Sequence, residues 1–249
     1  MNTIFKKTLL IIFIIIFLLI FSICAYIIIH DFLECKENNQ DTLELIEDAI
    51  DTNIKGEDDK SDIEKSINWN YLKSVNEDII AWIEIENTNI NYPILKDNNN
   101  LYYLKHSYNK KYNSNGSIFT VDAKPFENDE TLIYGHNMRN GTMFSILGNY
   151  LDRNYLNLHQ NIKIYTPFQN YNCQIFSVYS IGIASENNNI KLLEFNDRIN
   201  YYKNASKYKI EIAEPIHKII KLSTCSYLNT KKNPTDQRYY IIANLIQIK

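Results

Sequence analysis

Three reactive side chains lie next to apolar segments that are widely separated in the sequence. Cys225 ends an apolar run at 219–224, and Arg238 opens the next apolar run of the chain. His136 follows a third run, at 131–134, after a single glycine. A thiolate is a strong nucleophile, an imidazole can donate a proton near neutral pH, and a guanidinium can bind an oxyanion. These three types of side chain are the parts that acyl transfer through a thioester requires.

Each of the three residues also has an ordinary structural interpretation. A lone cysteine at a strand end is more often a small buried hydrophobe, and an arginine at a strand start is often a surface ion-pair partner. A histidine after a strand is often a turn residue. The other histidines are weaker candidates, because they lie in polar segments, beside the N-terminal apolar run or at an exposed edge: His30, His106, His159 and His217. The hypothesis of acyl transfer therefore depends on the presence of all three residues together.

The cysteines do not form a metal-binding or disulfide pattern. They are widely and irregularly spaced, and no pair has the CxxC spacing: Cys24, Cys35, Cys173 and Cys225. Structural zinc sites and disulfide frameworks use closer, paired spacings, so we expect no metal and no cofactor. Cys173 lies inside an apolar run and is expected to be a buried hydrophobe.

An uncharged segment at residues 8–29 predicts a transmembrane helix. About 22 residues span roughly 33 Å as a helix, which is enough for the core of a bilayer. Lys6 and Lys7 precede the segment, and an acidic stretch follows it. This charge bias predicts a cytoplasmic N-terminus, residues 1–7, and an extracellular remainder. The expected location is the cell membrane, with a single membrane span.

The rest of the chain divides into a spacer and one domain. Residues 30–66 are polar and acidic and predict a stalk, with a short helix at 43–50. Residues 67–249 contain most of the remaining apolar runs and are numerous enough to bury a core. The formal net charge of -3 gives no indication of nucleic-acid binding.

Short apolar runs bounded by turn residues dominate the domain and predict strands. These runs lie at 81–85, 90–94, 117–121, 131–134, 161–166, 171–181, 208–212, 218–224 and 239–248. Helices are predicted at 69–80, 101–106, 142–151 and 192–205. Asparagine clusters predict loops at 98–100 and 187–189. Many short strands with few helices predict a mostly β fold, a closed or nearly closed barrel with helices at its edges.

The residues around the cysteine and the histidine resemble those of a known family. The stretch Leu222-Ser223-Thr224-Cys225, followed by Arg238 and an apolar strand, resembles the motif of sortases, the cysteine transpeptidases of Gram-positive cell surfaces. The stretch 134–137, Tyr-Gly-His-Asn, is similar to the histidine motif of that family. Segments within 82–94, 115–122 and 141–151 are similar to its class B branch, and the resemblance covers residues 67–249.

The resemblance implies a fold and a reaction. The fold is an eight-stranded barrel preceded by N-terminal helices and one transmembrane helix, with a helix inserted between the sixth and seventh strands, for which 192–205 is the candidate. Cys225 would attack the threonine carbonyl of a five-residue sorting motif near the C-terminus of a surface protein. His136 would protonate the leaving amine, and Arg238 would hold the substrate and the oxyanion. An amine of a peptidoglycan precursor or cross-bridge would then resolve the thioester.

The resemblance also implies a substrate groove. The matching positions are Asn100, Leu104, Tyr134, Ser223 and Thr224. For Leu104 and Tyr134, packing in the core is an equally good interpretation. Arg238 is the only arginine after Cys225, which supports its assignment.

Several functions remain open at this stage. The leading hypothesis is a membrane-anchored transpeptidase that joins individual surface proteins to the cell wall. A sortase of the same kind could instead polymerise pilins. An anchored cysteine hydrolase would release peptides without transferring them, and a non-catalytic surface-binding barrel would keep Cys225 only as a buried apolar residue.

Overall fold

The chain forms two compact units, Met1–Leu43 and Glu44–Lys249. The computed structural model describes residues 3–52, 65–98, 101–212, 215–228 and 235–248. Helix α1 runs from Thr3 to Ala49; its part up to Leu43 lies in the first unit, and its last turns belong to the second. Among the described helices, the stretch Phe5–His30 is the one that is long and apolar enough to cross a membrane, with a mean hydropathy of 3.3. It contains the predicted span at 8–29.

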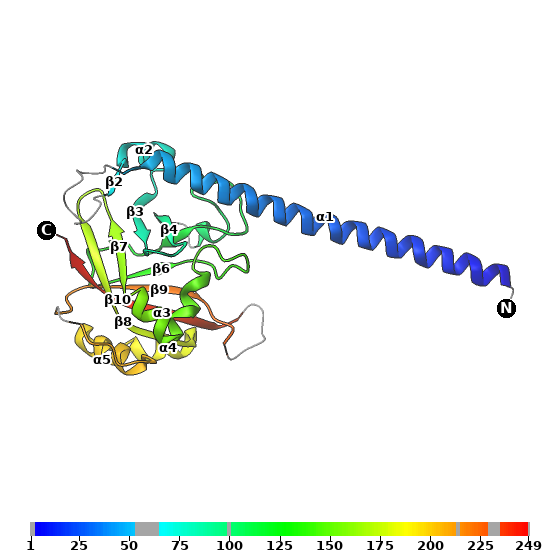
Figure 1. The fold of residues 1–249 in the computed structure, drawn as a ribbon. Coiled ribbons are helices and arrows are strands. Elements are labelled where there is room, and N and C mark those ends of the chain that lie inside the picture. Colours follow the sequence, from blue (N-terminus) through cyan, green and yellow to red (C-terminus); the bar gives the residue numbers. More distant parts are fainter. Residues whose placement is uncertain (1–2, 53–64, 99–100, 213–214, 229–234, 249) are drawn as a thin grey trace. The chain divides into compact units, whose positions relative to one another are not determined.

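The second unit is built around a closed β-barrel of eight strands (Figure 1). The strands are β3 (Ile79–Glu84), β4 (Asn91–Lys96), β5 (Ile118–Thr120), β6 (Glu130–Tyr134), β7 (Asn161–Tyr165), β8 (Asn170–Gly182), β9 (Ile219–Cys225) and β10 (Gln237–Gln247). Their order around the barrel is β10-β8-β7-β3-β4-β5-β6-β9. Two pairs are parallel, β4 with β5 and β6 with β9, and the other pairs are antiparallel. The predicted barrel is confirmed.

Short helices surround the barrel. They are α2 (Trp69–Val75), η1 (Tyr102–Leu104), η2 (Ser145–Leu151), α3 (Arg153–Leu158), α4 (Ile183–Ile190) and α5 (Phe195–Ala205). Before α2, strand β1 (Ile50–Thr52) pairs with β2 (Lys65–Ile67) in antiparallel fashion. Helices α4 and α5 connect the sixth and seventh barrel strands, β8 and β9, and both contact β8 (Figure 1). The implied insertion is therefore present, and it begins earlier than 192.

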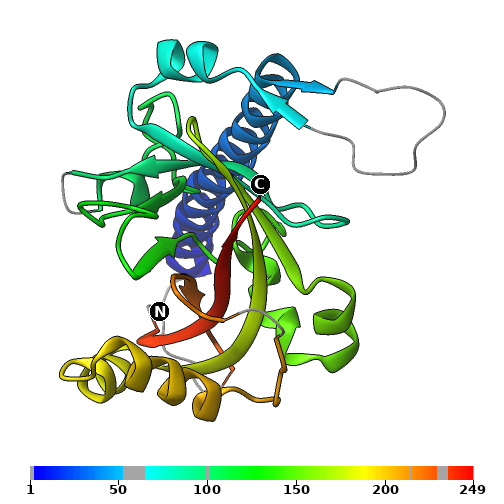
Figure 2. The ribbon, with the colours of Figure 1, turned by 90° about the vertical axis from the view of Figure 1, so that its left-hand side faces the viewer.

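Alternating side chains fill the two faces of the barrel wall. The long strands β8 and β10 lie side by side (Figure 2). Leu222 of β9 and Ile241 of β10 belong to the central core, whereas Tyr240 belongs to a second apolar cluster with Tyr202 of α5. Cys173 is fully buried in the central core, and burial raises the pKa of its thiol. It is the buried hydrophobe that its apolar surroundings predicted.

Three local predictions are wrong. The asparagines at 187–189 lie inside α4 and do not form a loop. The segment 208–212, all of it described, is not a strand. Its apolar residues make separate contacts in place of strand pairing: Ile210 is buried, and the Tyr208 hydroxyl donates to the Leu151 carbonyl at 2.6 Å. The helix predicted over 69–80 ends at Val75, since Ile79 and the residues after it pair in β3.

A buried ion pair attaches α4 to β9 and accounts for the helix in an asparagine-rich segment. The Lys221 ammonium contacts the Glu186 carboxylate, and the two side chains are 2% and 1% exposed. The hydroxyls of Tyr179 and Tyr201 donate to the same carboxylate at 2.7 and 2.9 Å. Burial, and then the charge of Glu186, raise the pKa of Tyr179. These tertiary contacts outweigh the weak helix propensity of asparagine.

Replacing Glu186 with alanine should strongly destabilise the second unit. The change leaves the Lys221 ammonium buried without a counter-charge, which costs about 3 kcal/mol. Urea unfolding followed by circular dichroism measures this loss. The double variant Lys221→Met/Glu186→Leu should recover most of it, because a well-packed apolar pair can replace a buried ion pair at little cost. A Glu186→Ala protein as stable as the wild type would show that the pair does not hold α4.

Candidate active site

Cys225 and Arg238 are direct cross-strand partners. Cys225 is the last residue of β9, Arg238 is near the start of β10, and the antiparallel register places the two opposite each other. Residues directly opposite in such a pair lie on the same face of the sheet, with Cβ atoms about 4.5–5.5 Å apart. Side chains along a strand alternate between its two faces, so Leu222 and Thr224 share one face of β9 and Ser223 and Cys225 share the other. Leu222 belongs to the central core, so the face of Cys225 is the outer one. The thiol and the guanidinium therefore share the outer face of the barrel wall.

The histidine segment runs beside the end of β9. Strand β6 is parallel to β9, with Tyr134 opposite Ser223. Past the end of β6, the Gly135 amide donates to the Ser223 carbonyl at 3.2 Å. The Asn137 side chain donates to the carbonyl of Cys225 at 2.7 Å. His136 lies between these two contacts, so the backbone brings it to the nucleophile's end of β9.

The His136 ring is oriented by a backbone carbonyl. Its Nε2 lies 2.8 Å from the carbonyl oxygen of Leu104. Since a carbonyl only accepts, Nε2 carries a proton that it donates to Leu104. The other nitrogen, Nδ1, has no hydrogen-bond partner among the described residues. The Phe144 amide donates to the His136 carbonyl at 2.9 Å and fixes the backbone. The imidazole is thus held through one nitrogen and available through the other.

The Arg238 side chain is half-buried and held through one nitrogen. Its Nη1 donates to the carbonyls of Thr235 and Gln237, at 2.9 and 2.8 Å. The guanidinium has five N–H donors, and those on Nε and Nη2 have no partner among the described residues. These donors are the ones that could meet an acyl oxygen at the neighbouring sulfur.

Gly135 allows the close packing that the histidine segment needs. A Cβ at this position would lie 2.5 Å from the Ile118 side chain and 2.7 Å from the ring of Phe144. The glycine therefore lets the segment that carries His136 approach the core and remain hydrogen-bonded to β9.

Two residues that support the site were not predicted. Asn137 ties the histidine segment to Cys225. Ser226 is fully buried, and its amide donates to the Gln237 carbonyl at 2.9 Å, while its hydroxyl and carbonyl accept from Ser180 and Thr235. It thereby closes the connection between the cysteine and the arginine. Asn137 directly follows His136, and Ser226 directly follows Cys225. No sequence pattern indicates their contacts, because most of their hydrogen-bond partners are distant in sequence.

The predicted groove residues lie around this site, with one outside the described residues. Tyr134 is half-buried and stacks on Phe119 at a centroid distance of 5.4 Å. Burial is the main cause that raises the pKa of Tyr134, and the charge of Arg238 opposes it. Leu104 packs against the same apolar cluster as Phe119 and bonds His136 through its carbonyl. Asn100 lies outside the described residues.

Ser223 and Thr224 are both buried but on opposite faces of β9. Ser223 is 3% exposed and lies opposite both Tyr134 and Tyr240, on the face of Cys225. Thr224 is 2% exposed and lies on the other face. Its hydroxyl oxygen is buried without a hydrogen-bond partner among the described residues.

Comparison with known families identifies the fold and its chemistry. The model of the sortase domain matches residues 83–246, which include His136, Cys225 and Arg238. The chain belongs to the sortase family. Sortase B of Listeria monocytogenes is 33% identical to it over 207 residues, which cover 80% of this chain and 79% of the relative. Sortase B of Staphylococcus aureus is 28% identical over 185 residues, which cover 71% and 74%.

Solved sortase structures share the barrel. A Staphylococcus aureus sortase B–substrate complex superposes with a TM-score of 0.64 at 26% identity and covers 72% of this sortase and 85% of that chain. Sortase B of Clostridium perfringens gives a TM-score of 0.64 at 27% identity and covers 72% and 99%. The resemblance to class B sortases is confirmed. This sortase is a cysteine transpeptidase that acts on surface proteins.

Proposed function

We propose that Cys225, His136 and Arg238 are the catalytic residues of this transpeptidase. The observation that carries the proposal is the convergence at one strand end. Arg238 lies opposite Cys225, and the residue after His136 is hydrogen-bonded to the carbonyl of Cys225. A nucleophile, a proton donor and an oxyanion-binding group are thus brought together by neighbouring strands.

Each residue would perform one part of the acyl transfer. The Cys225 thiolate attacks the carbonyl carbon of the scissile peptide bond, and the negative charge that develops on the oxygen is met by the unpaired donors of Arg238. The leaving amine takes a proton from the imidazolium form of His136, which carries one proton on Nε2, bonded to the Leu104 carbonyl, and a second on Nδ1, the one that is transferred. The C–N bond breaks and a thioester to Cys225 remains. An incoming amine attacks this thioester, the C–S bond breaks and the thiolate leaves, and the proton that the amine loses returns to Nδ1 of His136.

The acyl donor would be the sorting motif near the C-terminus of a surface protein. Leu104, Tyr134, Ser223 and Asn100 would line the groove for this five-residue motif. Thr224, whose side chain lies on the inner face of β9, would support the groove wall from behind. Tyr134 supports this placement, because it is only half-buried and is close enough for the charge of Arg238 to act on the pKa of its hydroxyl. The acceptor would be an amine of a peptidoglycan precursor or cross-bridge.

The catalytic domain would work outside the cell. We place residues 1–7 in the cytoplasm, 8–29 in the membrane and 30–66 in an extracellular spacer, with the catalytic domain at 67–249. The two lysines before the apolar segment support this orientation. A membrane-impermeant thiol reagent applied to whole cells should therefore reach Cys225. Labelling of Cys225 only after lysis would show that the catalytic domain lies in the cytoplasm.

A peptide library with and without an added amine tests the function. We expect the purified protein to cleave pentapeptide motifs of the sorting type and to join the N-terminal fragment to the amine. Cleavage that yields only hydrolysed product at any amine concentration would favour a hydrolase. Binding of peptides without any turnover would favour a non-catalytic barrel. Transfer to the amino group of a pilin lysine in preference to peptidoglycan-type amines would favour pilus assembly.

Replacing Arg238 with alanine should lower kcat/KM about 10²- to 10³-fold, the usual effect of removing one oxyanion-stabilising donor group. Arg238→Lys should recover only a small part, because an ammonium lacks the planar fork of donors. Steady-state kinetics with the best library peptide measure both variants. Arg153→Ala, which changes an exposed arginine of α3, is the control and should retain activity. Full activity of Arg238→Lys would show that the planar set of guanidinium donors is not needed for catalysis.

A further inference from the structure

A pocket of about 640 Å³ lies at the opposite end of the barrel from Cys225. Lys218, which lines the pocket, directly precedes β9, whereas Cys225 is the last residue of this seven-residue strand. A strand rises about 3.3 Å per residue, so the two ends are about 20 Å apart. The remaining walls come from α2, the ends of β3, β4 and β8, residues 123–127 and the turn between β7 and β8. The pocket is therefore separate from the site of acyl transfer.

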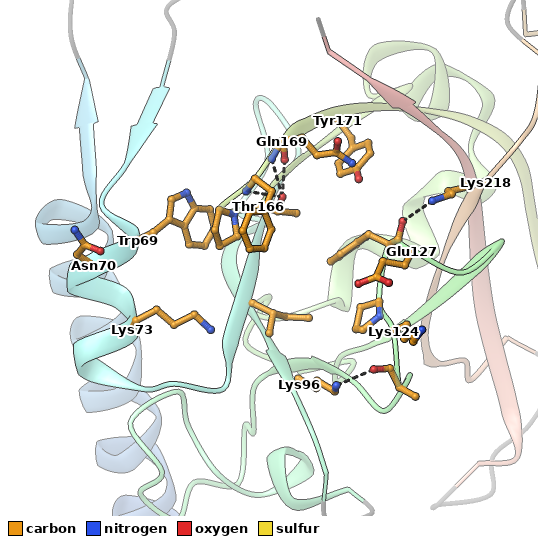
Figure 3. A pocket seen from close by; sticks show the side chains of 16 residues that line it. Trp69, Asn70, Lys73, Lys96, Lys124, Glu127, Thr166, Gln169, Tyr171 and Lys218 are labelled. Carbon is orange, nitrogen blue, oxygen red and sulfur yellow. Dashed lines mark hydrogen bonds between the residues drawn. The ribbon is translucent and has the colours of Figure 1, made fainter.

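The walls of the pocket are positively charged, although the whole chain has a net charge of -3. Four lysines and one glutamate line it: Lys73, Lys96, Lys124, Lys218 and Glu127. None of them forms a salt bridge with another described residue. Figure 3 shows Lys73 extending from α2 on one side and Lys124 and Lys218 on the other. Such an arrangement suits a ligand that carries more than one negative charge.

Three of the lysines are already oriented by backbone carbonyls. The Lys73 ammonium donates to the Glu77 carbonyl at 2.7 Å. The Lys96 ammonium donates to the Ala123 carbonyl at 2.7 Å, and the Lys218 ammonium donates to the Phe126 carbonyl at 3.2 Å. Each ammonium has three N–H donors, so donors remain for an anion. The contacts of Lys96 and Lys218 hold residues 123–126 and thereby shape this wall of the pocket.

Aromatic rings and side-chain amides complete the lining. Trp69 and Phe168 offer ring surface, and Phe168 is 95% exposed. Asn70 and Gln169 offer amide groups that both donate and accept. In Figure 3, Trp69 projects from α2 in the direction of Thr166 and Gln169. Rings pack against the C–H faces of sugars and polyols, and amides bond their hydroxyls. The lining thus combines surfaces for a carbohydrate with charges for phosphate.

We propose that this pocket binds a phosphodiester-linked polymer of sugars or polyols. The lysines, which come from four separate segments, would pair with successive phosphates, and Trp69 and Phe168 would pack against the units between them. The proposal rests on the proposed function in one respect, since an extracellular catalytic domain is exposed to such cell-wall polymers. Binding would hold the domain on the wall polymer while the opposite end of the barrel performs the acyl transfer.

Trp69 provides the signal for a direct binding experiment. The chain has two tryptophans, and Trp82 is fully buried with its indole N–H donated to Asn91 at 2.6 Å. The full chain, purified in a neutral detergent, is titrated with poly(glycerol phosphate) while tryptophan fluorescence is recorded. We expect a saturable change that is lost in Trp69→Phe. The affinity should fall as salt is added, because lysine–phosphate attraction is screened.

Charge variants decide whether the pocket is the binding site. Lys73→Glu/Lys124→Glu should weaken binding at least about tenfold, because two attractions become repulsions. The charge-matched control Lys203→Glu, on an exposed position of α5, should bind as the wild type does. Equal affinity of the double variant and the wild type would overturn the proposal. So would binding that is as tight to neutral dextran, to poly-glutamate or to phosphatidylglycerol vesicles as to the polymer.

The polymer-binding measurement does not depend on catalysis. Cys225→Ala should bind the polymer with the affinity of the wild type, because its sulfur lies at the other end of β9. Loss of peptide cleavage with retained polymer binding, or the reverse, would therefore show which of the two proposals fails.

Discussion

Cys225→Ala should have no detectable transpeptidation. The thioester intermediate forms on this sulfur, so its removal should lower kcat/KM by at least ~10⁴-fold, as the loss of a catalytic nucleophile does in related mechanisms. The change should leave the fold intact, because the Cys225 side chain is only partly buried at the end of β9. Cleavage of the best library peptide, followed by chromatography, measures the effect.

Cys173 provides the matched control. It is also a free cysteine but is fully buried in the central core, and burial raises the pKa of its thiol. Cys173→Ala should therefore keep near-normal kcat/KM while losing some stability through the cavity it leaves. A Cys225→Ala protein that still cleaves and transfers peptide would refute the assignment of the nucleophile.

His136→Ala should lower kcat/KM about 10²- to 10⁴-fold with peptide substrates, the usual contribution of general acid–base catalysis. An amine is a poor leaving group until it is protonated, and His136 Nδ1 is the proton donor that the geometry offers. A substrate with an activated ester at the scissile bond needs little protonation of its leaving group. The same variant should therefore lose much less activity with that ester.

The comparison of the two substrates separates proton donation from a structural role. If His136 merely positioned Leu104 through the 2.8 Å contact, both substrates would lose activity to the same extent. His217→Ala, which changes an exposed histidine just before β9, should leave both reactions unchanged. Equal losses with the amide and the ester would contradict the assigned role.

The candidate residues and their joint action were predicted from local motifs and the family that these motifs indicate, whereas the contacts that bring the residues together were not. The stretch at 222–225 and the histidine motif identify the family, and the family implies the barrel. That Arg238 lies opposite Cys225 depends on the register of β9 with β10, which is set by packing around the whole barrel. The roles of Asn137 and Ser226 are likewise non-local, since each bonds to backbone or side chains that only the fold brings near.

The local errors have the same origin. Asparagine disfavours helices, so 187–189 predicted a loop, but the buried pair of Glu186 with Lys221 stabilises α4 from outside the segment. Ile210 belongs to the core without belonging to a strand, so the apolar run at 208–212 had the composition of a strand and not its pairing. In both cases tertiary contacts outweigh the local pattern.

The measurement that tests the mechanism most directly is the capture of the acyl-enzyme. The protein is mixed with the best library peptide in the absence of amine, quenched in acid within the first turnovers, digested and analysed by tandem mass spectrometry. We expect the N-terminal peptide fragment in thioester linkage to Cys225, released by hydroxylamine and lost on addition of an amine acceptor. Rapid cleavage with no acyl group on Cys225, or with the acyl group on another residue, would contradict it.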